Sequence, residues 1–169
     1  MIGREGIDAV SHRRVAEVAG VPLGSTTYYF TSRGDMLVQA LEHYARGEID
    51  ELLREFAEPC TSAQALIERL VAVAVPQLGE HRWQALAQYA LFQESARRGE
   101  LRPIVNEWNQ AWLEVLSSAF AAIGRPSDEV EARMALGMLD GLLLAGLALP
   151  QERYVDDVFR PALERWLSA

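Results

Sequence analysis

The sequence predicts an all-α protein, and three observations lead to that prediction. Apolar residues recur with a helical period in almost every segment, and no segment alternates apolar and polar residues as a half-buried strand does. Half of the 169 residues are apolar and 24% are charged, which is enough to bury a core. With only 12 Gly and 7 Pro, the chain has the composition of neither a disordered nor a collagen-like protein.

The first two predicted helices are short. Residues 11–19 form one helix, with Ser11 as its N-cap and Gly20 as the glycine that follows its last turn. A second helix covers about 22–29, because proline is tolerated in the first turn of a helix. Two short helices around a glycine turn have the geometry of a helix-turn-helix unit.

Longer helices follow this pair. The sequence Ser32-Arg-Gly-Asp35 has capping-box spacing and starts a helix that reaches about Glu58, just before Pro59. Its apolar stripe slips by one residue beside Gly47, which indicates a bend or a change of packing partner. Ser127 marks the start of a later helix. The remaining predicted helices span 62–79, 82–98, 101–123, 128–149 and 152–168.

The composition also bears on location. A single cysteine, Cys60, cannot form an internal disulfide, which favours a reducing compartment. The first six residues lack the apolar core of a signal peptide. The most apolar stretch, 134–149, contains Asp140 and is shorter than the roughly 20 residues that span a bilayer. We therefore expect a cytoplasmic protein with no membrane partner.

No motif of an enzyme is present. The sequence has no nucleophile elbow, phosphate-binding loop or dinucleotide fingerprint, and its 3 His residues lack metal-ligand spacing. We therefore expect no catalytic residues, no metal and no cofactor. Cys60 leaves two alternatives open, an exposed redox-sensing thiol and an inert cysteine at a helix end.

The negative charge is unevenly distributed. The net charge is −8, yet residues 1–34 carry four Arg and three acids, hence +1. Residues 35–169 carry twelve Arg and twenty-one acids, hence −9. Only the first segment could lie against phosphates without strong repulsion.

The two short helices have distinct inner and outer residues. We expect an apolar set to hold them together, namely Val15, Val18, Ala19, Val21 and Phe30. The outer face of the second helix is then small, hydroxylated and aromatic, with Gly24, Ser25, Thr27 and Tyr28. Such a face can enter a major groove closely and offer short donors and acceptors to bases and phosphates.

Three short motifs carry a resemblance to a known family. They are Ala19-Gly20-Val21, Tyr28-Tyr29-Phe30 and Ser32-Arg33-Gly34-Asp35, and through them residues 1–39 resemble the DNA-binding domain of the TetR family of bacterial transcriptional regulators. The resemblance implies a first helix that packs across the other two, of which residues 2–6 form only the end. It also implies phosphate contacts by Ser11, Tyr28 and Arg33. The predicted DNA-binding residues are Ser11, Arg13, Leu23, Gly24, Ser25, Thr27, Tyr28 and Arg33.

The rest of the chain is predicted to bind an effector. We divide the chain into a helix-turn-helix DNA-binding domain, 1–40, and a helical effector-binding and dimerisation domain, 41–169. Segment 81–94 is apolar nearly all round, so its glutamines either anchor a ligand in an apolar cavity or reach solvent from a core helix. The resemblance favours a cavity for a small apolar or amphipathic effector. The predicted effector-binding residues are Gln84, Gln88, Tyr89, Phe92, Trp108, Asn109, Trp112 and Met138.

The 128–149 helix carries a row of small residues spaced by four, Gly137, Gly141 and Ala145. The row lets another helix approach closely, and packing within one chain is the simpler interpretation. The resemblance implies that the last two helices pair with those of a second copy. That interface would bury in part Leu142, Leu143, Leu147, Val158, Leu163 and Trp166. A two-fold dimer also presents two recognition helices to half-sites about 34–36 Å apart.

Together these features predict a homodimeric, ligand-responsive transcriptional regulator. We expect a repressor that a small molecule releases from its operator DNA. The alternative is a helical dimeric small-molecule-binding or scaffolding protein without DNA binding, which the largely missing first helix favours.

Overall fold

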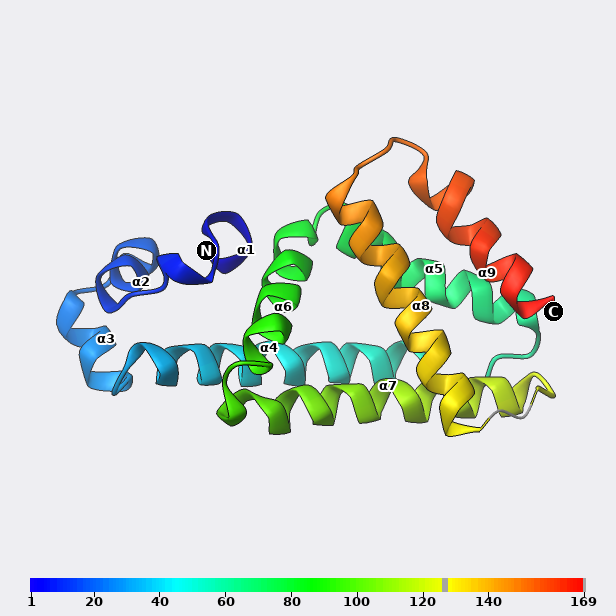
Figure 1. Ribbon diagram of the computed structural model, residues 1–169, viewed down its shortest axis with the longest axis horizontal. Coiled ribbons are helices and arrows are strands. Elements are labelled where there is room, and N and C mark those ends of the chain that lie inside the picture. The colour runs from blue at the N-terminus through cyan, green and yellow to red at the C-terminus, as the bar shows by residue number, and fades with distance from the viewer. Residues whose placement is uncertain (126–127, 169) are drawn as a thin grey trace. The chain divides into compact units, whose positions relative to one another are not determined.

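The computed structural model describes residues 1–125 and 128–168, and among them it contains helices but no strand (Figure 1). This confirms the all-α prediction. The α-helices are α1 (Ile2–Glu5), α2 (His12–Ala19), α3 (Leu23–Tyr29), α4 (Arg33–Glu55), α5 (Ala63–Leu78), α6 (Arg82–Ser95), α7 (Arg102–Ala122), α8 (Glu129–Ala148) and α9 (Arg160–Leu167). Two 3₁₀ segments, η1 (Ile7–Ala9) and η2 (Gly99–Leu101), and one π-helical segment, η3 (Val155–Phe159), complete it.

The chain forms two compact units. The head unit consists of Met1–Glu48 and Trp83–Glu107. The body unit consists of Ile49–Arg82 and the described residues from Trp108 onward. The division passes through α4 after Glu48, so the unit that holds α2 and α3 also includes α6.

Local capping explains where the helices of the head unit begin and end. The Ser11 hydroxyl accepts a hydrogen bond from the backbone N–H of Arg14 at 3.2 Å, as the sequence predicts for an N-cap. Gly20 ends α2 with a left-handed backbone (φ 68°) that costs a side-chain-bearing residue more. Ser32 accepts from the backbone N–H of Asp35 at 3.1 Å and starts α4.

The contact between α2 and α3 differs from the predicted one. Val18 is 54% exposed, Val21 is 40% exposed and Ala19 is exposed too, so none of these three holds the two helices together. Ala16 and Thr26 are buried there instead. The Thr26 hydroxyl lies 3.1 Å from the carbonyl oxygen of His12 on α2 and 2.9 Å from that of Leu23. Small side chains occupy the crossing because they let two short helices approach closely.

The body unit is built around α5, which packs against both α8 and α9 (Figure 1). Its core contains leucines that are at most 2% exposed, Leu66, Leu70, Leu147 and Leu163. Leu143 is buried as well. Leu143, Leu147 and Leu163 are therefore core residues of one chain, which corrects the prediction that a second copy buries them.

Hydrogen bonds and an ion pair hold the ends of the helices of the body unit in place. The Arg82 guanidinium donates to the carbonyl oxygen of Leu147 at 2.6 Å, in the last turn of α8, where carbonyls have no helical partner. Arg125 donates to the carbonyl oxygen of Trp166 at 3.0 Å and pairs with Glu131 at 3.0 Å. Arg125 thus joins the segment after α7 to both α8 and α9.

The last predicted helix, 152–168, is only partly confirmed. The chain first forms the π-helical segment Val155–Phe159 and then α9, which has Pro161 in its first turn. Proline has no N–H to donate to the preceding turn, and a wider turn accommodates that loss. At the other predicted start, Asp128 caps α8 by accepting from the N–H of Glu131 at 2.8 Å, whereas Ser127 lies outside the described residues.

None of the described helices is both long enough and apolar enough to cross a membrane.

Gly146 on α8 is expected to tolerate no side chain. A Cβ there would lie 2.6 Å from the ring of Tyr154, which is buried and donates its hydroxyl to the carbonyl oxygen of Leu142. We expect Gly146→Ala to lower the free energy of unfolding by about 1–3 kcal/mol. Gly47→Ala is the control, because an added Cβ meets open space there, and it should raise stability by up to about 1 kcal/mol. Urea denaturation measures both, and equal effects would contradict the packing described.

Candidate nucleic-acid interface and effector site

The α3 helix presents an open polar and aromatic face. Leu23 is 51% exposed and Tyr28 83% exposed, and Gly24 and Thr27 are exposed between them. Open space surrounds Gly24, where an added Cβ would meet no atom within 4 Å. Of the residues predicted to contact DNA from this helix, only Ser25 is half-buried. The helix therefore offers a narrow surface with short side chains, which a groove can receive.

Charge on the neighbouring α2 is partly neutralised. The Arg14 guanidinium forms two hydrogen bonds of 2.8 Å with the carboxylate of Glu5 and lies 3.1 Å from Glu17. Arg14 thereby lowers the pKa of Glu5, and the pKa of Arg14 itself is raised. Arg13 is exposed and forms no ion pair with a described residue. Arg13 therefore supplies the available positive charge at the start of α2.

Arg33 points inward to the backbone rather than away from the head unit. Its Nε donates to the carbonyl oxygen of Val10 at 3.0 Å, and its Nη2 donates to that of Ile7 at 2.8 Å. Nη2 also lies 3.3 Å from the Asp8 carboxylate. Arg33 fastens the start of α4 to the segment that precedes α2. The sequence does not indicate this role, since the partners of Arg33 lie more than twenty positions away.

Four predicted effector-binding residues lie on α6 in the head unit. Gln88 is buried, and its side-chain oxygen accepts a hydrogen bond from the Tyr44 hydroxyl on α4 at 3.2 Å. Gln84 is exposed, whereas Tyr89 and Phe92 are half-buried. Of the two alternatives for the glutamines, Gln84 reaches solvent. Gln88 is buried and hydrogen-bonded within the chain, and its role as a ligand anchor stays a prediction.

The other four lie in the body unit. Trp108 is 4% exposed, and Asn109 and Trp112 on the same helix are half-buried, as is Met138 on α8. Because the eight residues belong to two separate units, the idea that they line one cavity stays a prediction. The spacing of Trp108 and Trp112 does place two indole rings on one face of α7.

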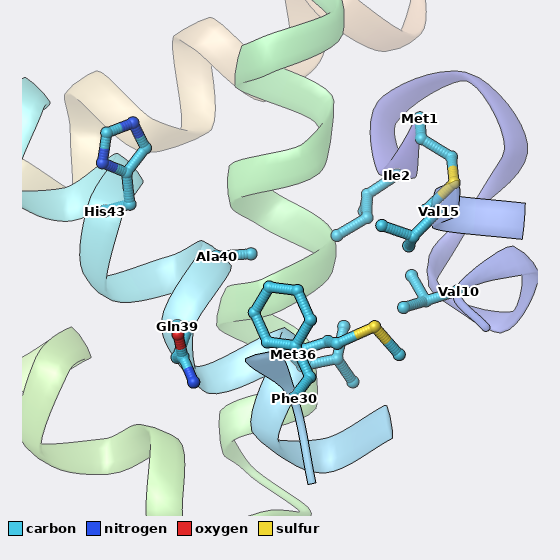
Figure 2. A pocket seen from close by; sticks show the side chains of 10 residues that line it. Met1, Ile2, Val10, Val15, Phe30, Met36, Gln39, Ala40 and His43 are labelled. Atoms are coloured by element: carbon cyan, nitrogen blue, oxygen red, sulfur yellow. The ribbon is translucent and has the colours of Figure 1, made fainter. Parts of the chain in front are cut away.

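The head unit contains a cavity of about 350 Å³ that the sequence did not reveal (Figure 2). Met1 and Ile2 line it at the start of α1, Val10 and Val15 line it before and within α2, and Met36 and His43 line it on α4. Figure 2 shows Val15 and Ile2 facing Phe30 and Met36 across the opening. Val15 and Phe30 are predicted core residues, but no sequence pattern indicates whether the space between such residues is filled.

Cys60 is a buried thiol, not an exposed one. Its side chain is 3% exposed, and burial raises the pKa of the thiol, which disfavours the reactive thiolate. A pocket of about 230 Å³ adjoins it in the body unit, between Phe56 and Val115. Of the two alternatives, the geometry favours the inert cysteine. Among the described residues there is no group of His, Cys, Asp and Glu that could hold a metal ion.

Comparison with known proteins agrees with this arrangement. The family model of the tetracyclin repressor-like C-terminal domain matches residues 61–169. A TetR-family member from Streptomyces coelicolor is 33% identical, with 96% of this chain and 89% of that chain covered at a TM-score of 0.74. The multidrug binding protein EbrR in complex with ethidium is also 33% identical, covering 97% and 90% of the two chains at a TM-score of 0.72.

More distant structures share the fold. The transcriptional regulator FadR from Bacillus subtilis, in complex with stearoyl-CoA, is 18% identical, covering 99% of this chain and 92% of that chain at a TM-score of 0.77. Among curated proteins, no relative matches the chain.

The matched family model and the 33% identical structures define the chain as an all-helical transcriptional regulator. The chain belongs to the TetR family of transcriptional regulators, because the family model covers more than half of it and the 33% identical structure covers nearly all of it.

We expect substitutions of the two adjacent threonines of α3 to affect stability differently, because Thr26 is buried and Thr27 is exposed. Thr26→Val keeps the shape but removes the hydroxyl that joins α3 to α2, so it should lower the free energy of unfolding by about 1 kcal/mol. Thr27→Val changes an exposed position and should alter stability by less than about 0.5 kcal/mol. Thermal denaturation of both variants is the measurement. A larger loss for Thr27→Val would mean that the buried contact does not hold the pair.

Proposed function

We propose that this protein is a homodimeric repressor that binds operator DNA through α3 and is released from it by a small apolar or amphipathic effector. The open face of α3 in a chain of this family is the observation that carries the proposal. The protein would then act as a binding protein without catalysis, and in the cytoplasm, where bacterial DNA is found.

The proposed DNA contacts divide into two kinds. Leu23, Gly24 and Thr27 would lie nearest the base edges, because short side chains let the helix axis approach the groove floor. Ser11, Arg13, Ser25 and Tyr28 would contact phosphates and set the register. Arg33 is proposed to support binding chiefly by holding α4 against the segment before α2, since its guanidinium is occupied by carbonyl oxygens.

Because the positive charge of residues 1–34 is small, the proposed interface would depend mainly on how closely α3 fits the groove. Residues 1–34 carry a net charge of only +1, and Arg14 is already paired with Glu5 and Glu17. Non-specific attraction to phosphate should therefore be weak. Affinity would depend on close fit and on hydrogen bonds in the groove, so the difference between operator and random DNA should be large.

The proposed effector site uses the aromatic residues of α7 that belong to the body unit. The likeness to EbrR, whose structure holds ethidium, supports an effector with flat apolar rings. Trp108 and Trp112 would contact such rings, and Asn109 would supply a polar anchor. An effector that prefers the non-binding state must lower DNA affinity by the same factor by which DNA lowers effector affinity. Gly47 is proposed as the flexible point of α4 in this transition.

The proposed dimer surface lies on α8. Val130 and Met134 are 63% and 69% exposed, and an added Cβ at Gly137 or Gly141 would meet no atom within 4 Å. The row of small residues is therefore not used for packing within the described part of this chain. A second copy of α8 would cover this apolar face, as cyclic two-fold dimers commonly do.

The function is tested by DNA binding. We expect the purified chain to bind the duplex upstream of its own gene tightly and to prefer it to a scrambled duplex. Arg13→Gln should weaken binding and reduce the slope of log affinity against log salt by about 1. Ethidium as the probe effector should weaken binding and quench tryptophan fluorescence. Fluorescence anisotropy of labelled DNA at two salt concentrations measures the affinities.

A matched control shows whether the effect of Arg13→Gln comes from its position or from the loss of any one positive charge. Arg102→Gln removes an exposed arginine from α7 and should leave DNA affinity and salt dependence unchanged. Equal affinity for operator and scrambled duplex would overturn the repressor proposal in favour of a dimeric binding protein that does not read DNA.

The dimer surface is tested by one charged substitution. Met134→Arg should raise the dimer dissociation constant at least tenfold, because it buries an unpaired charge between two copies of α8. Val75→Arg on α5 is the control at an apolar side chain of similar character, 47% exposed, and should remain dimeric. Sedimentation velocity over a concentration series measures both variants, and identical behaviour would remove α8 from the interface.

A further inference from the structure

We propose that α3 recognises the methyl groups of thymine in the major groove through the side chains of Leu23 and Thr27, and that none of its side chains hydrogen-bonds to guanine, an inference that rests on the proposed function. It adds to that function the chemistry by which operator DNA would be told from other DNA. All of the residues concerned lie within α3, which belongs to the head unit.

The α3 helix lacks the side chains that form paired hydrogen bonds with bases. Its 7 residues are Leu-Gly-Ser-Thr-Thr-Tyr-Tyr, with no Arg, Lys, Asn, Gln, Asp or Glu among them. Arg and Lys recognise guanine by donating to its O6 and N7 atoms, and Asn and Gln recognise adenine through a pair of hydrogen bonds. Because α3 can form neither contact, its preference among bases has to come from another interaction.

The threonine hydroxyls of α3 are engaged by backbone carbonyl oxygens. The Thr27 hydroxyl donates to the carbonyl oxygen of Gly24 at 3.1 Å and lies 3.4 Å from that of Leu23. The hydroxyl of the buried Thr26 lies against the carbonyl oxygens of Leu23 and His12. A hydroxyl has one proton, so neither threonine can also donate to the O6 or N7 of guanine. The group that the exposed Thr27 keeps free for contact is its methyl.

Leu23 and Thr27 lie one turn apart on the same face of the helix. Both are exposed, and Gly24 between them has open space around it, because an added Cβ would meet no atom within 4 Å. The face therefore presents an isobutyl group and a methyl group beside bare backbone. Thymine is the base whose major-groove edge carries a methyl, and apolar contact with that methyl is the interaction both side chains can make.

The aromatic hydroxyls of α3 are placed for phosphates rather than for bases. In a helix-turn-helix unit, the first residues of the second helix contact the base edges. Leu23 and Gly24 are the first two residues of α3, whereas Tyr28 and Tyr29 are the last two. The two tyrosine rings meet edge to face with their centroids 5.2 Å apart and are 83% and 70% exposed. Their length and their position at the far end of the helix direct them to the DNA backbone.

Thymine methyl groups can be removed from DNA before the operator sequence is known. The duplex upstream of the gene is prepared with deoxyuridine in place of thymidine, which removes the C5-methyl and keeps the base pairing. We expect the full chain to bind this duplex at least tenfold more weakly than the unmodified one, because the apolar contacts are lost in both heads of a dimer. A duplex with 7-deazaguanine, which lacks the N7 acceptor, is the control and should bind within about twofold of the unmodified duplex. Fluorescence anisotropy measures the three affinities.

Two substitutions at Thr27 distinguish its methyl from its hydroxyl. Thr27→Ser removes the methyl and keeps the hydroxyl, so it should weaken binding to the thymine duplex at least threefold and leave binding to the deoxyuridine duplex unchanged. Thr27→Val keeps a methyl and removes the hydroxyl, so it should retain the full preference for thymine. Since Thr27 is exposed, both variants are expected to fold.

Leu23 is tested against a leucine of equal exposure. Leu23→Ala should reduce the ratio of the affinities for the thymine and deoxyuridine duplexes at least threefold. Leu53→Ala on α4 is the matched control, because both leucines are 51% exposed and Leu53 lies outside α3, so this variant should leave the ratio unchanged. Circular dichroism verifies that all variants keep their helix content.

The outcomes distinguish this inference from the proposed function. A thymine preference that Thr27→Ser and Leu23→Ala reduce, and that Thr27→Val keeps, would support it. Equal affinity for the thymine and deoxyuridine duplexes, with the upstream duplex still preferred to its scrambled version, would overturn it and leave the proposed function in place. A thymine preference that no α3 variant changes, or a tenfold loss with 7-deazaguanine, would overturn it as well. Equal affinity for the upstream and scrambled duplexes would overturn both.

Discussion

The two helices that would read DNA are eight and seven residues long, and helices of that length are not stable alone in water. Their position is set by two polar side chains. Thr26 joins α3 to the first turn of α2, and Arg33 joins α4 to the segment in front of α2. The orientation of the exposed face of α3, and with it every proposed contact to DNA, depends on these few hydrogen bonds.

The surface charge of the head unit also depends on a few paired side chains. Of the four arginines among residues 1–34, Arg33 is occupied by carbonyl oxygens and Arg14 by two glutamates. Arginines that stabilise the fold contribute less to a positive surface. A head of this kind gains little from long-range attraction, so it is suited to selective rather than to general binding of nucleic acid.

The body unit is organised by the two faces of α8. One face is buried, with Leu139, Leu143 and Leu147 in the core and Gly146 pressed against Tyr154. The opposite face carries Val130, Met134 and two open glycines. A helix that is apolar all round is normally covered all round, so the open face is the strongest argument for a second copy. A dimer built there would give the assembly two heads, as a two-fold operator requires.

The sequence by itself determined the helices and the family. Ser11, Gly20 and Ser32 mark helix ends through hydrogen bonds to residues three or four positions away, so their effect is readable locally. It also identified the face of α3, because small and hydroxylated residues recur along one short helix. The π-helical turn before α9 escaped prediction, since helical periodicity does not distinguish a slightly wider turn.

Only the tertiary structure decided which side chains meet. The sequence predicted Val18 as a core residue, whereas the crossing of α2 and α3 buries the smaller Ala16 instead. Gln88 is buried and accepts a hydrogen bond from a tyrosine 44 positions away. Arg33 joins two segments by donating to a backbone carbonyl oxygen, a group that every residue has and that no sequence pattern singles out. The cavity of the head unit is likewise a property of the distances between helices. Burial, pairing and empty space depend on which faces come together in space, and periodicity along the chain carries no information about that distance.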